Sequence, residues 1–244
     1  MLTIEAKNFF LKKKYIWFSE SPFDVPDCDA MFFYACKNNV DLPGFEKREA
    51  PTMVIDLEQD LETIWSNMGK KSCRYFIKRA DREEIEIKTS GHYDEFIRLY
   101  SKFVVQKGFY SWPMKIDTLR KYGTLFTAFH HGAIMAGIIL VEDLSNIRWL
   151  LGGSKRLEVD KEKTVMVSCA NRLLIWEAIK YAKKKGLKEF DFGGYYTGND
   201  KKDPRYTIAH FKKQFGGSLV THYKYIKYYS RIYLLAKKVV KIIR

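Results

Sequence analysis

The sequence predicts a mixed α/β domain with a short N-terminal extension. Three observations support this class. Three short apolar segments follow one another with tight turns between them, a long amphipathic segment comes next, and a short apolar segment ending in two glycines follows it. Three such strands form an antiparallel meander, and the strand–helix–strand order after them indicates a parallel crossover. Apolar residues make up 46% of the chain, enough for a packed core.

The first part of the chain contains short strands and then helices. Aromatic runs broken by Pro22 and Pro26 predict strands, and the Pro43-Gly44 pair predicts a turn. Apolar residues at helical spacing after Leu57 predict helices. The expected elements, in order, are strands over 15–19, 30–35 and 52–56, helices over 57–68 and 70–82, and a strand over 85–88.

The central part alternates helices with the meander. Ser90 is the expected N-cap of a helix that Gly108 ends, and His131-Gly132 is a tight turn between two strands. Gly186 ends the long helix, and Gly216-Gly217 ends a short one. The expected elements are a helix over 115–122, strands over 125–130, 133–142 and 147–151, a helix over 164–185, a strand over 187–192, a helix over 207–215 and a strand over 218–225.

We expect three parts in the chain. Residues 1–55 form the extension, residues 56–226 form the main domain, and residues 227–244 form a basic amphipathic helix. That last helix has an apolar stripe and six basic residues without an acid, which suits either an anionic membrane surface or docking on the domain.

The net charge and the cysteine pattern limit which partners and which cellular compartment the sequence allows. Lysine and arginine outnumber acids by 43 to 29, a net charge of +14 that favours anionic partners or serves solubility alone. The four cysteines form no CxxC pair and no zinc-spaced cluster with histidine, so we expect no metal. The first 14 residues lack the apolar core of an export signal, and no long uncharged apolar run is present. These features predict a reduced, cytoplasmic protein.

Two segments carry a family resemblance. One is Gly186-Leu-Lys-Glu-Phe-Asp-Phe-Gly-Gly194, and the other is Ile208-Ala-His-Phe-Lys-Lys-Gln-Phe-Gly-Gly217. Together they resemble the GxxxFDxGG and FKxxFGG pattern of Fem-like peptidyltransferases and related GNAT acyltransferases. The segment from Trp65 to Ala80 resembles the helical entry to the same domain, and the resemblance covers residues 56–226.

The resemblance implies a GNAT fold with an acyl donor held where two core strands splay apart. Here those strands are 147–151 and 187–192. Relatives of this type use aminoacyl-tRNA or acyl-CoA as a donor substrate, with no permanently bound cofactor, and both donors stay open. The chain departs from the type because residues 1–55 are too few for a second GNAT domain, and because residues 159–165 contain no glycine for the usual pyrophosphate loop.

The candidate catalytic residues follow the strand over 187–192. Asp191 beside two glycines suits a general base or a group that orients an amine, and it equally suits a cap on the turn. Tyr195 suits an acid that protonates the leaving group, or simple loop packing.

The candidate donor-binding residues are glycines at strand ends and one helix position. Backbone N–H groups near Gly152 and Gly153 suit stabilisation of an oxyanion, and Gly193 and Gly194 allow close approach of substrate. Thr164 marks the expected helix start, where a donor pyrophosphate would bind.

Basic residues are the candidates for binding the acceptor or a phosphate. A solvated helix face is the alternative for each of them. The candidates are Lys70, Lys71, Arg74, Lys78, Lys212 and Lys213.

The sequence therefore predicts acyl or aminoacyl transfer to an amine or hydroxyl of a cell-envelope or surface-glycan precursor, by direct attack on the donor carbonyl. The acceptor would be a nucleotide- or lipid-linked sugar or peptide, which loses its proton to Asp191 or to a water that Asp191 holds. The alternative is a non-catalytic basic module that binds nucleic acid or an anionic membrane, a reading that leaves the strand-Asp-Gly-Gly motif without a purpose.

Overall fold

The chain forms two compact units. A computed structural model describes residues 1–8, 10–25, 27–109 and 114–234. Unit 1 contains Met1–Thr52 and Val220–Arg244, and unit 2 contains Met53–Leu219. Residues 220–226, which the sequence analysis placed in the main domain, thus belong with the N-terminal residues. Two strands, β4 (Glu46–Asp56) and β10 (Ser218–Tyr228), run from one unit into the other.

Unit 1 is built on four neighbouring strands, in the order β1-β2-β3-β10. Strands β1 (Leu2–Asn8) and β2 (Leu11–Trp17) form an antiparallel hairpin. Strand β3 (Ala30–Cys36) pairs parallel with β2 and antiparallel with β10. The sequence analysis missed β1, because Lys7, Lys12 and Lys13 give the hairpin a mixed composition without an aromatic run.

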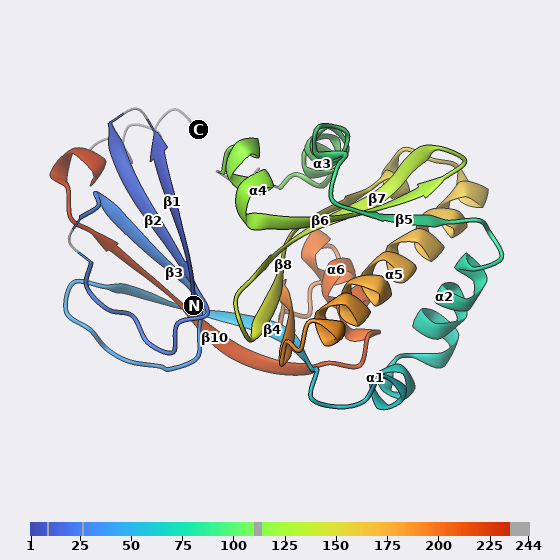
Figure 1. Ribbon diagram of the computed structural model, residues 1–244, viewed down its shortest axis with the longest axis horizontal. Helices are drawn as coiled ribbons and strands as arrows, with labels where there is room; N and C mark the ends of the chain where they lie inside the picture. The colour runs from blue at the N-terminus through green and yellow to red at the C-terminus, as the bar shows by residue number, and fades with distance from the viewer. Residues whose placement is uncertain (9, 26, 110–113, 235–244) are drawn as a thin grey trace. The chain divides into compact units, whose positions relative to one another are not determined.

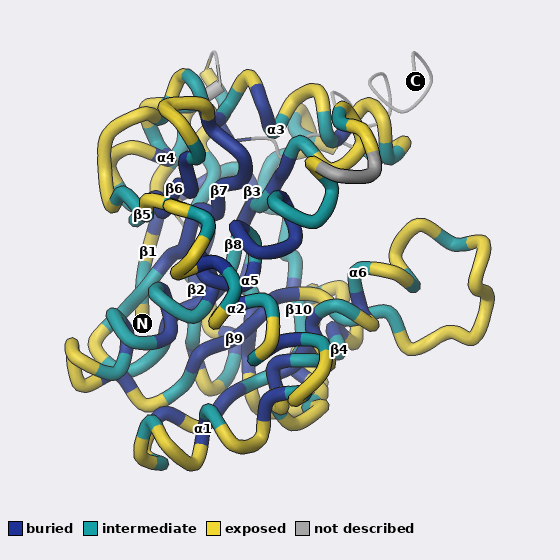
Figure 2. The backbone as a smooth tube through the Cα atoms, turned by 90° about the vertical axis from the view of Figure 1, so that its right-hand side faces the viewer, coloured by how far each residue is buried: buried dark blue, intermediate teal, exposed yellow. Residues whose placement is uncertain are grey.

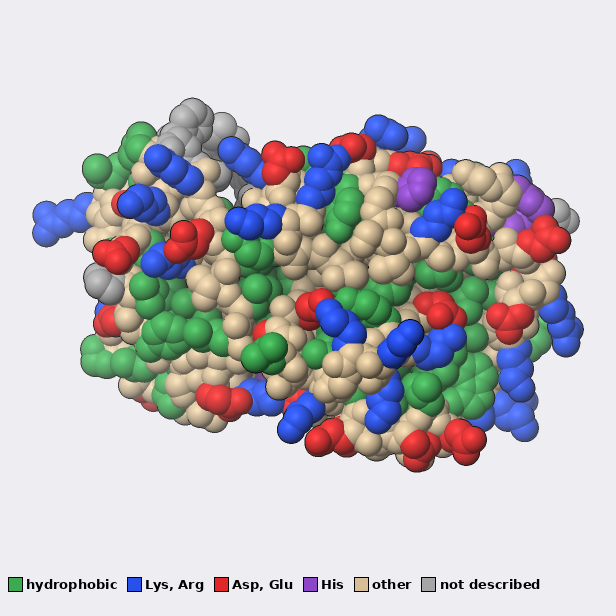
Figure 3. Space-filling model, in the orientation of Figure 1, with side chains coloured by type: hydrophobic (Ala, Val, Ile, Leu, Met, Phe, Trp, Pro, Cys, Tyr) green, Lys and Arg blue, Asp and Glu red, His purple; other side chains and the backbone are tan. Residues whose placement is uncertain are grey.

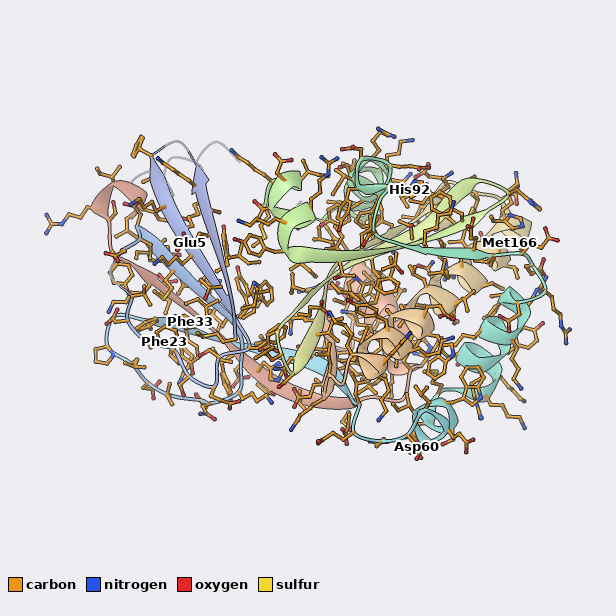
Figure 4. All side chains as sticks on the ribbon, in the orientation of Figure 1. Glu5, Phe23, Phe33, Asp60, His92 and Met166 are labelled. Carbon is orange, nitrogen blue, oxygen red and sulfur yellow. The ribbon has the colours of Figure 1, made fainter. Side chains whose placement is uncertain are left out.

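The core of unit 1 lies on one face of these strands. Met31 and Phe33 alternate with half-buried neighbours on β3, as expected for a strand with one buried face. Phe23 packs edge-on against Phe33, with ring centroids 5.1 Å apart (Figure 4). The buried members of this core are Ile16, Cys28, Met31, Phe33, Cys36 and Tyr225.

Unit 2 contains the sheet order β4-β9-β8-β7-β6-β5. Strands β5 to β8 pair antiparallel in sequence, so the expected meander is present with one further strand at its edge. His131 and Gly132 both take positive φ between β6 and β7, as a two-residue hairpin turn requires. The strands are β5 (Glu86–Thr89), β6 (Gly123–His130), β7 (Ala133–Glu142), β8 (Asn146–Ser154) and β9 (Glu189–Gly194).

Helices cover both faces of this sheet. In Figure 1, α3 and α4 lie on one side of the meander and α1, α2 and α5 lie on the other. Helices α2 and α5 pack against the central strands in the main core, whereas the Phe96 ring of α3 fills the space above Gly137. The helices are α1 (Leu61–Asn67), the π-helical turn η1 (Lys70–Arg74), α2 (Tyr75–Ala80), α3 (Tyr93–Lys107), α4 (Ile116–Tyr122), the 3₁₀ turn η2 (Lys155–Leu157), α5 (Lys161–Lys184) and α6 (Pro204–Lys213).

Side-chain caps set several helix starts. Asp60, labelled in Figure 4, caps α1 by accepting from the Thr63 N–H at 2.7 Å. Asp160 and Asp203 cap α5 and α6, so both helices begin three residues before their expected starts. The expected cap Ser90 is wrong, because the N-cap position of α3 belongs to His92, a left-handed residue without a side-chain cap bond.

The C-terminal helix expected over 227–244 falls largely on residues outside the described part. Lys227 and Tyr228 instead end strand β10, and a helical turn follows at 231–234. Within residues 1–8, 10–25, 27–109 and 114–234, no helix combines the length and apolar character needed to cross a bilayer.

Candidate functional site

Strands β8 and β9 of unit 2 share only a short parallel ladder. Their register runs from the pair Asn146↔Glu189 to the pair Arg148↔Asp191, although β8 continues to Ser154. Beyond Arg148, the register of β8 in the described structure is with β7. We call the edge of β8 after this last pair, together with the end of β9, the strand opening. In the described structure, no register pair joins β8 to β9 beyond this point.

A bulge on β8 lies at the strand opening. Leu151 is opposite Ile139 and Trp149 is opposite Leu140, so Leu150 is the extra residue. The indole of Trp149 folds back along its own strand and donates from Nε1 to the Leu151 carbonyl at 2.7 Å. A Cβ on Gly152 would lie 2.4 Å from that indole, so only glycine leaves room for this arrangement.

Asp191 is held at the last ladder pair. It is 2% exposed, and its Oδ2 forms a short ion pair with Nη1 of Arg148, itself 5% exposed. Its Oδ1 accepts from the Gly193 N–H at 2.7 Å. Gly193 has φ +74°, and a Cβ there would lie 2.7 Å from the Trp149 carbonyl oxygen. Both carboxylate oxygens are therefore engaged in fixing the turn and the arginine.

Lys212 reaches the same place from α6. It is 6% exposed, and its Nζ donates to the Gly194 carbonyl at 2.7 Å and lies 5.4 Å from the centre of the Trp149 ring. The pKa of Lys212 is lowered to about 7, mainly by burial and also by the charge of Arg148, with Asp191 acting in the opposite direction. The alternative of a solvated helix face is thus wrong for Lys212, whereas its neighbour Lys213 is exposed.

The other candidates from the sequence lie in different surroundings. Tyr195 is half-buried against the main core, directly after Gly194. A Cβ on Gly153 would lie 3.2 Å from the Cα of Tyr100, so this glycine lets α3 pack closely on β8. Figure 2 shows β8 and β9 as largely buried and the loop over 197–202 before α6 as exposed.

The N-terminus of α5 is capped by the carboxylate side chain of Asp160. Oδ1 of Asp160 accepts from the Lys163 N–H at 2.8 Å, and the Thr164 hydroxyl donates to the Asp160 carbonyl at 2.8 Å. A carboxylate at this position takes up the N–H group and the positive end of the helix dipole that a donor pyrophosphate would use. Thr164 is therefore in the first turn of α5, as expected, with its side chain bonded locally.

The basic candidates before α2 lie next to the end of α6. The Gly69 N–H donates to the Gln214 carbonyl at 2.9 Å, which brings Lys70 and Lys71 close to Lys213 in space. Lys70, Lys71 and Lys78 are exposed, and Arg74 is half-buried. Figure 3 shows lysine and arginine side chains on both units with acids interspersed, so the net charge is not confined to one patch on this face.

Two buried arginines were not singled out by the sequence analysis. Arg148 lies within β8 at 5% exposure, and Arg172 lies on the buried side of α5 at 6% exposure. A lone charge within an apolar segment was the available signal in both cases, because such a charge needs a partner when it is buried. Across the described ranges, no group of three His, Cys, Asp or Glu side chains is placed to hold a metal ion.

Comparisons with known proteins identify the fold. No family model and no curated protein matches the sequence. Among solved structures, FemX aligns over 96% of this chain and 85% of its own, with a TM-score of 0.65 at 14% identity. The C-terminal domain of a protein described as a lysylphosphatidylglycerol synthetase from Agrobacterium fabrum aligns over 99% and 85%, with a TM-score of 0.56 at 12% identity. L-PGS from Bacillus licheniformis aligns over 87% and 72%, with a TM-score of 0.56 at 16% identity. The expected mixed α/β, GNAT-like fold is confirmed.

Proposed function

We propose that the protein transfers an acyl or aminoacyl group from a soluble donor to an amine or hydroxyl of a cell-envelope or surface-glycan precursor. The observation that carries this proposal is the strand opening, with the buried Lys212 amine beside the Arg148–Asp191 pair. The structural similarity to FemX and to L-PGS supports transfer chemistry of this class. The precursor and the cytoplasmic location are part of the proposal.

In the proposed reaction, the donor carbonyl lies at the strand opening. In a β-strand, backbone N–H groups point alternately to one edge of the strand and to the other. One edge of β8 near Gly152 faces β7, so the N–H groups at the opposite edge are the donors that we propose. Those donors stabilise the oxyanion as the carbonyl carbon becomes tetrahedral. The new bond forms between the acceptor nitrogen or oxygen and the carbonyl carbon, and the bond to the donor sulfur or oxygen breaks.

We assign proton acceptance to Lys212 rather than directly to Asp191. Both oxygens of Asp191 are engaged by Arg148 and Gly193, whereas a lysine with a pKa of about 7 is partly neutral near neutral pH. Asp191 favours the protonated form of Lys212 and Arg148 disfavours it, so burial and Arg148 together keep the amine partly neutral before it accepts the acceptor's proton. Tyr195, which follows Gly194, is the proposed acid for the leaving group.

The donor stays one of two classes in this proposal. An acyl-CoA would need a place for its diphosphate other than the start of α5, because Asp160 occupies that helix end. An aminoacyl-tRNA would bring phosphodiesters across a wider basic surface. Titration calorimetry with CoA separates the two, since clear micromolar binding favours CoA.

A transfer assay tests the proposal. The protein is incubated with labelled acetyl-CoA or with labelled aminoacyl-tRNA, and transfer to envelope-precursor extracts is followed together with donor hydrolysis. We expect turnover with one donor, lost in Lys212→Met and retained in Lys184→Gln, which removes an exposed charge from α5. Binding of RNA or anionic vesicles without any turnover, unchanged by both substitutions, would favour the non-catalytic binding module instead.

A further inference from the structure

Arg172 is a buried arginine with neutral partners. It is 6% exposed on α5. Its Nη1 donates to the Ser168 carbonyl at 3.1 Å, and its Nη2 donates to Oε1 of Gln214 at 2.7 Å. Burial lowers the pKa of Arg172, and nearby Arg156 lowers it further while Cys73 acts in the opposite direction. A buried cation without a carboxylate carries an unbalanced charge.

The guanidinium is fixed by two aromatic rings from different helices. Its central carbon lies 4.7 Å from the ring centre of Phe76 on α2 and 5.1 Å from that of Phe211 on α6. Its position is therefore set by α2, α5 and α6 together. The Nε atoms of Arg172 and Arg74 are both buried and, in the described structure, have no hydrogen-bond acceptor.

Further cations surround this position. Gly69 bonds to Gln214, so the segment carrying Lys70, Lys71 and Arg74 meets the end of α6 at Lys213. In the described part of the chain none of these four residues, nor Arg172, forms an ion pair with an acidic side chain. We call the set formed by Arg74, Arg172, Lys213 and the two lysines after Gly69 the α5–α6 basic junction. It combines a buried guanidinium, an exposed basic rim and no internal anion.

We propose that the α5–α6 basic junction binds a phosphate group, with Arg172 at its floor and Lys70, Lys71 and Lys213 at its rim. Guanidinium and ammonium groups converging from several elements are the usual protein ligands of phosphate. The half-buried Arg74 carries the second buried Nε that lacks an acceptor in the described structure. This gives the donor phosphates a place other than the start of α5.

The identity of the ligand rests on the proposed function. Helix α6 contacts both places, because its Phe211 lies against Arg172 and its Lys212 reaches the Gly194 carbonyl at the strand opening. We therefore assign the junction to the phosphate-bearing end of the acyl donor. The binding site itself is tested without turnover, so failure of one proposal is distinguishable from failure of the other.

Inorganic pyrophosphate is the first probe. Its binding to the whole protein is followed by calorimetry and by the Nε–H NMR signal of Arg172, assigned through Arg172→Met. We expect saturable binding, a shift of that signal, and about tenfold or greater loss of affinity in Arg172→Met. Lys184→Gln, with one charge removed from the same helix, keeps wild-type affinity.

Several outcomes overturn the proposal. Absence of saturable binding, an unshifted Arg172 signal, or equal losses in Arg172→Met and Lys184→Gln would each show that Arg172 only joins the three helices. Should Arg172→Met fail to fold, Arg74→Gln decides, because its side chain is partly exposed. Wild-type pyrophosphate affinity in that variant rejects the site.

CoA and a short RNA ending in CCA are then compared as competitors of pyrophosphate. The compound that displaces pyrophosphate identifies the source of the phosphate.

Discussion

Arg148 and Arg172 are two buried arginines of unit 2 with opposite surroundings. Arg148 on β8 is paired with the buried carboxylate of Asp191, whereas Arg172 on α5 is bonded to a carbonyl and an amide oxygen. The first charge is balanced inside the chain and the second is not. Arg148 thus holds Asp191 at the end of the β8–β9 ladder, whereas the neutral partners of the buried Arg172 are the basis of the phosphate proposal. The predictions below test this difference, from the largest expected effect to the smallest.

Arg148→Met should be the most damaging change. It leaves the Asp191 carboxylate buried without its cation, which costs about 3–5 kcal/mol of unfolding free energy. Urea denaturation measures the loss. The double variant Arg148→Met, Asp191→Leu should recover part of the stability, because it removes the stranded charge. A single variant as stable as the wild type would contradict the balanced-pair interpretation.

Lys212→Met should abolish proton transfer with little damage to the fold. Loss of a general base lowers kcat by about 10²–10⁴-fold. In the wild type, kcat should rise with pH through about 7, since Lys212 must be neutral to accept a proton. A rate that falls with pH through this range would show that the protonated amine is the active form.

The pH dependence of stability has a definite sign for the same residue. The pKa of Lys212 is lowered to about 7 in the folded protein, from 10.5 for a solvent-exposed lysine. Between these two pKa values, Lys212 is protonated in the unfolded chain and neutral in the folded protein. The unfolding free energy of the wild type therefore rises with pH, relative to that of the Lys212→Met variant. The gap between the two proteins is largest below pH 7, which chemical denaturation at several pH values measures.

Arg172→Met should cost less than Arg148→Met. The change leaves two neutral acceptors unpaired, which costs about 1–3 kcal/mol, and it removes an unbalanced charge, which offsets part of that loss. Urea denaturation of both variants under the same conditions gives the comparison. Equal losses for the two arginines would remove the distinction drawn between them.

Asp160→Ala should have the smallest effect on stability. Loss of the N-cap of α5 costs about 0.5–2 kcal/mol. Urea denaturation measures the loss. Asp160→Asn, which keeps a capping oxygen, is the matched control and should retain stability.

Much of the fold could be predicted from the sequence, because periodicity and glycine positions act locally. The meander, the stop at Gly108 and the turn at His131-Gly132 are set by residues next to one another. The hairpin partner β1 and the early starts of α5 and α6 were missed. Charged residues mixed with apolar ones, such as Glu5 and Lys7, hid β1. The caps Asp160 and Asp203 were not weighed as helix signals.

The site was less predictable because its contacts join distant segments. Asp191 was singled out from its motif, but its partner Arg148 lies 43 residues earlier in the chain and only the strand register brings the two together. Lys212 and Lys213 are adjacent in sequence, yet one is buried and the other exposed. Which of them faces the strands depends on how α6 packs, and the local sequence does not specify this.

Strands β4 and β10 each cross from one unit to the other, so unit 1 is assembled from both ends of the chain. Tyr225 of β10 belongs to the same core as Phe33 of β3, and its hydroxyl accepts from the Val40 N–H at 2.9 Å. A truncation after Leu219 would strip that core of its last strand, just as deletion of the first 52 residues would leave β10 without its neighbour β3. During synthesis, unit 1 therefore stays incomplete until β10 has left the ribosome, whereas unit 2 is complete once Leu219 has emerged.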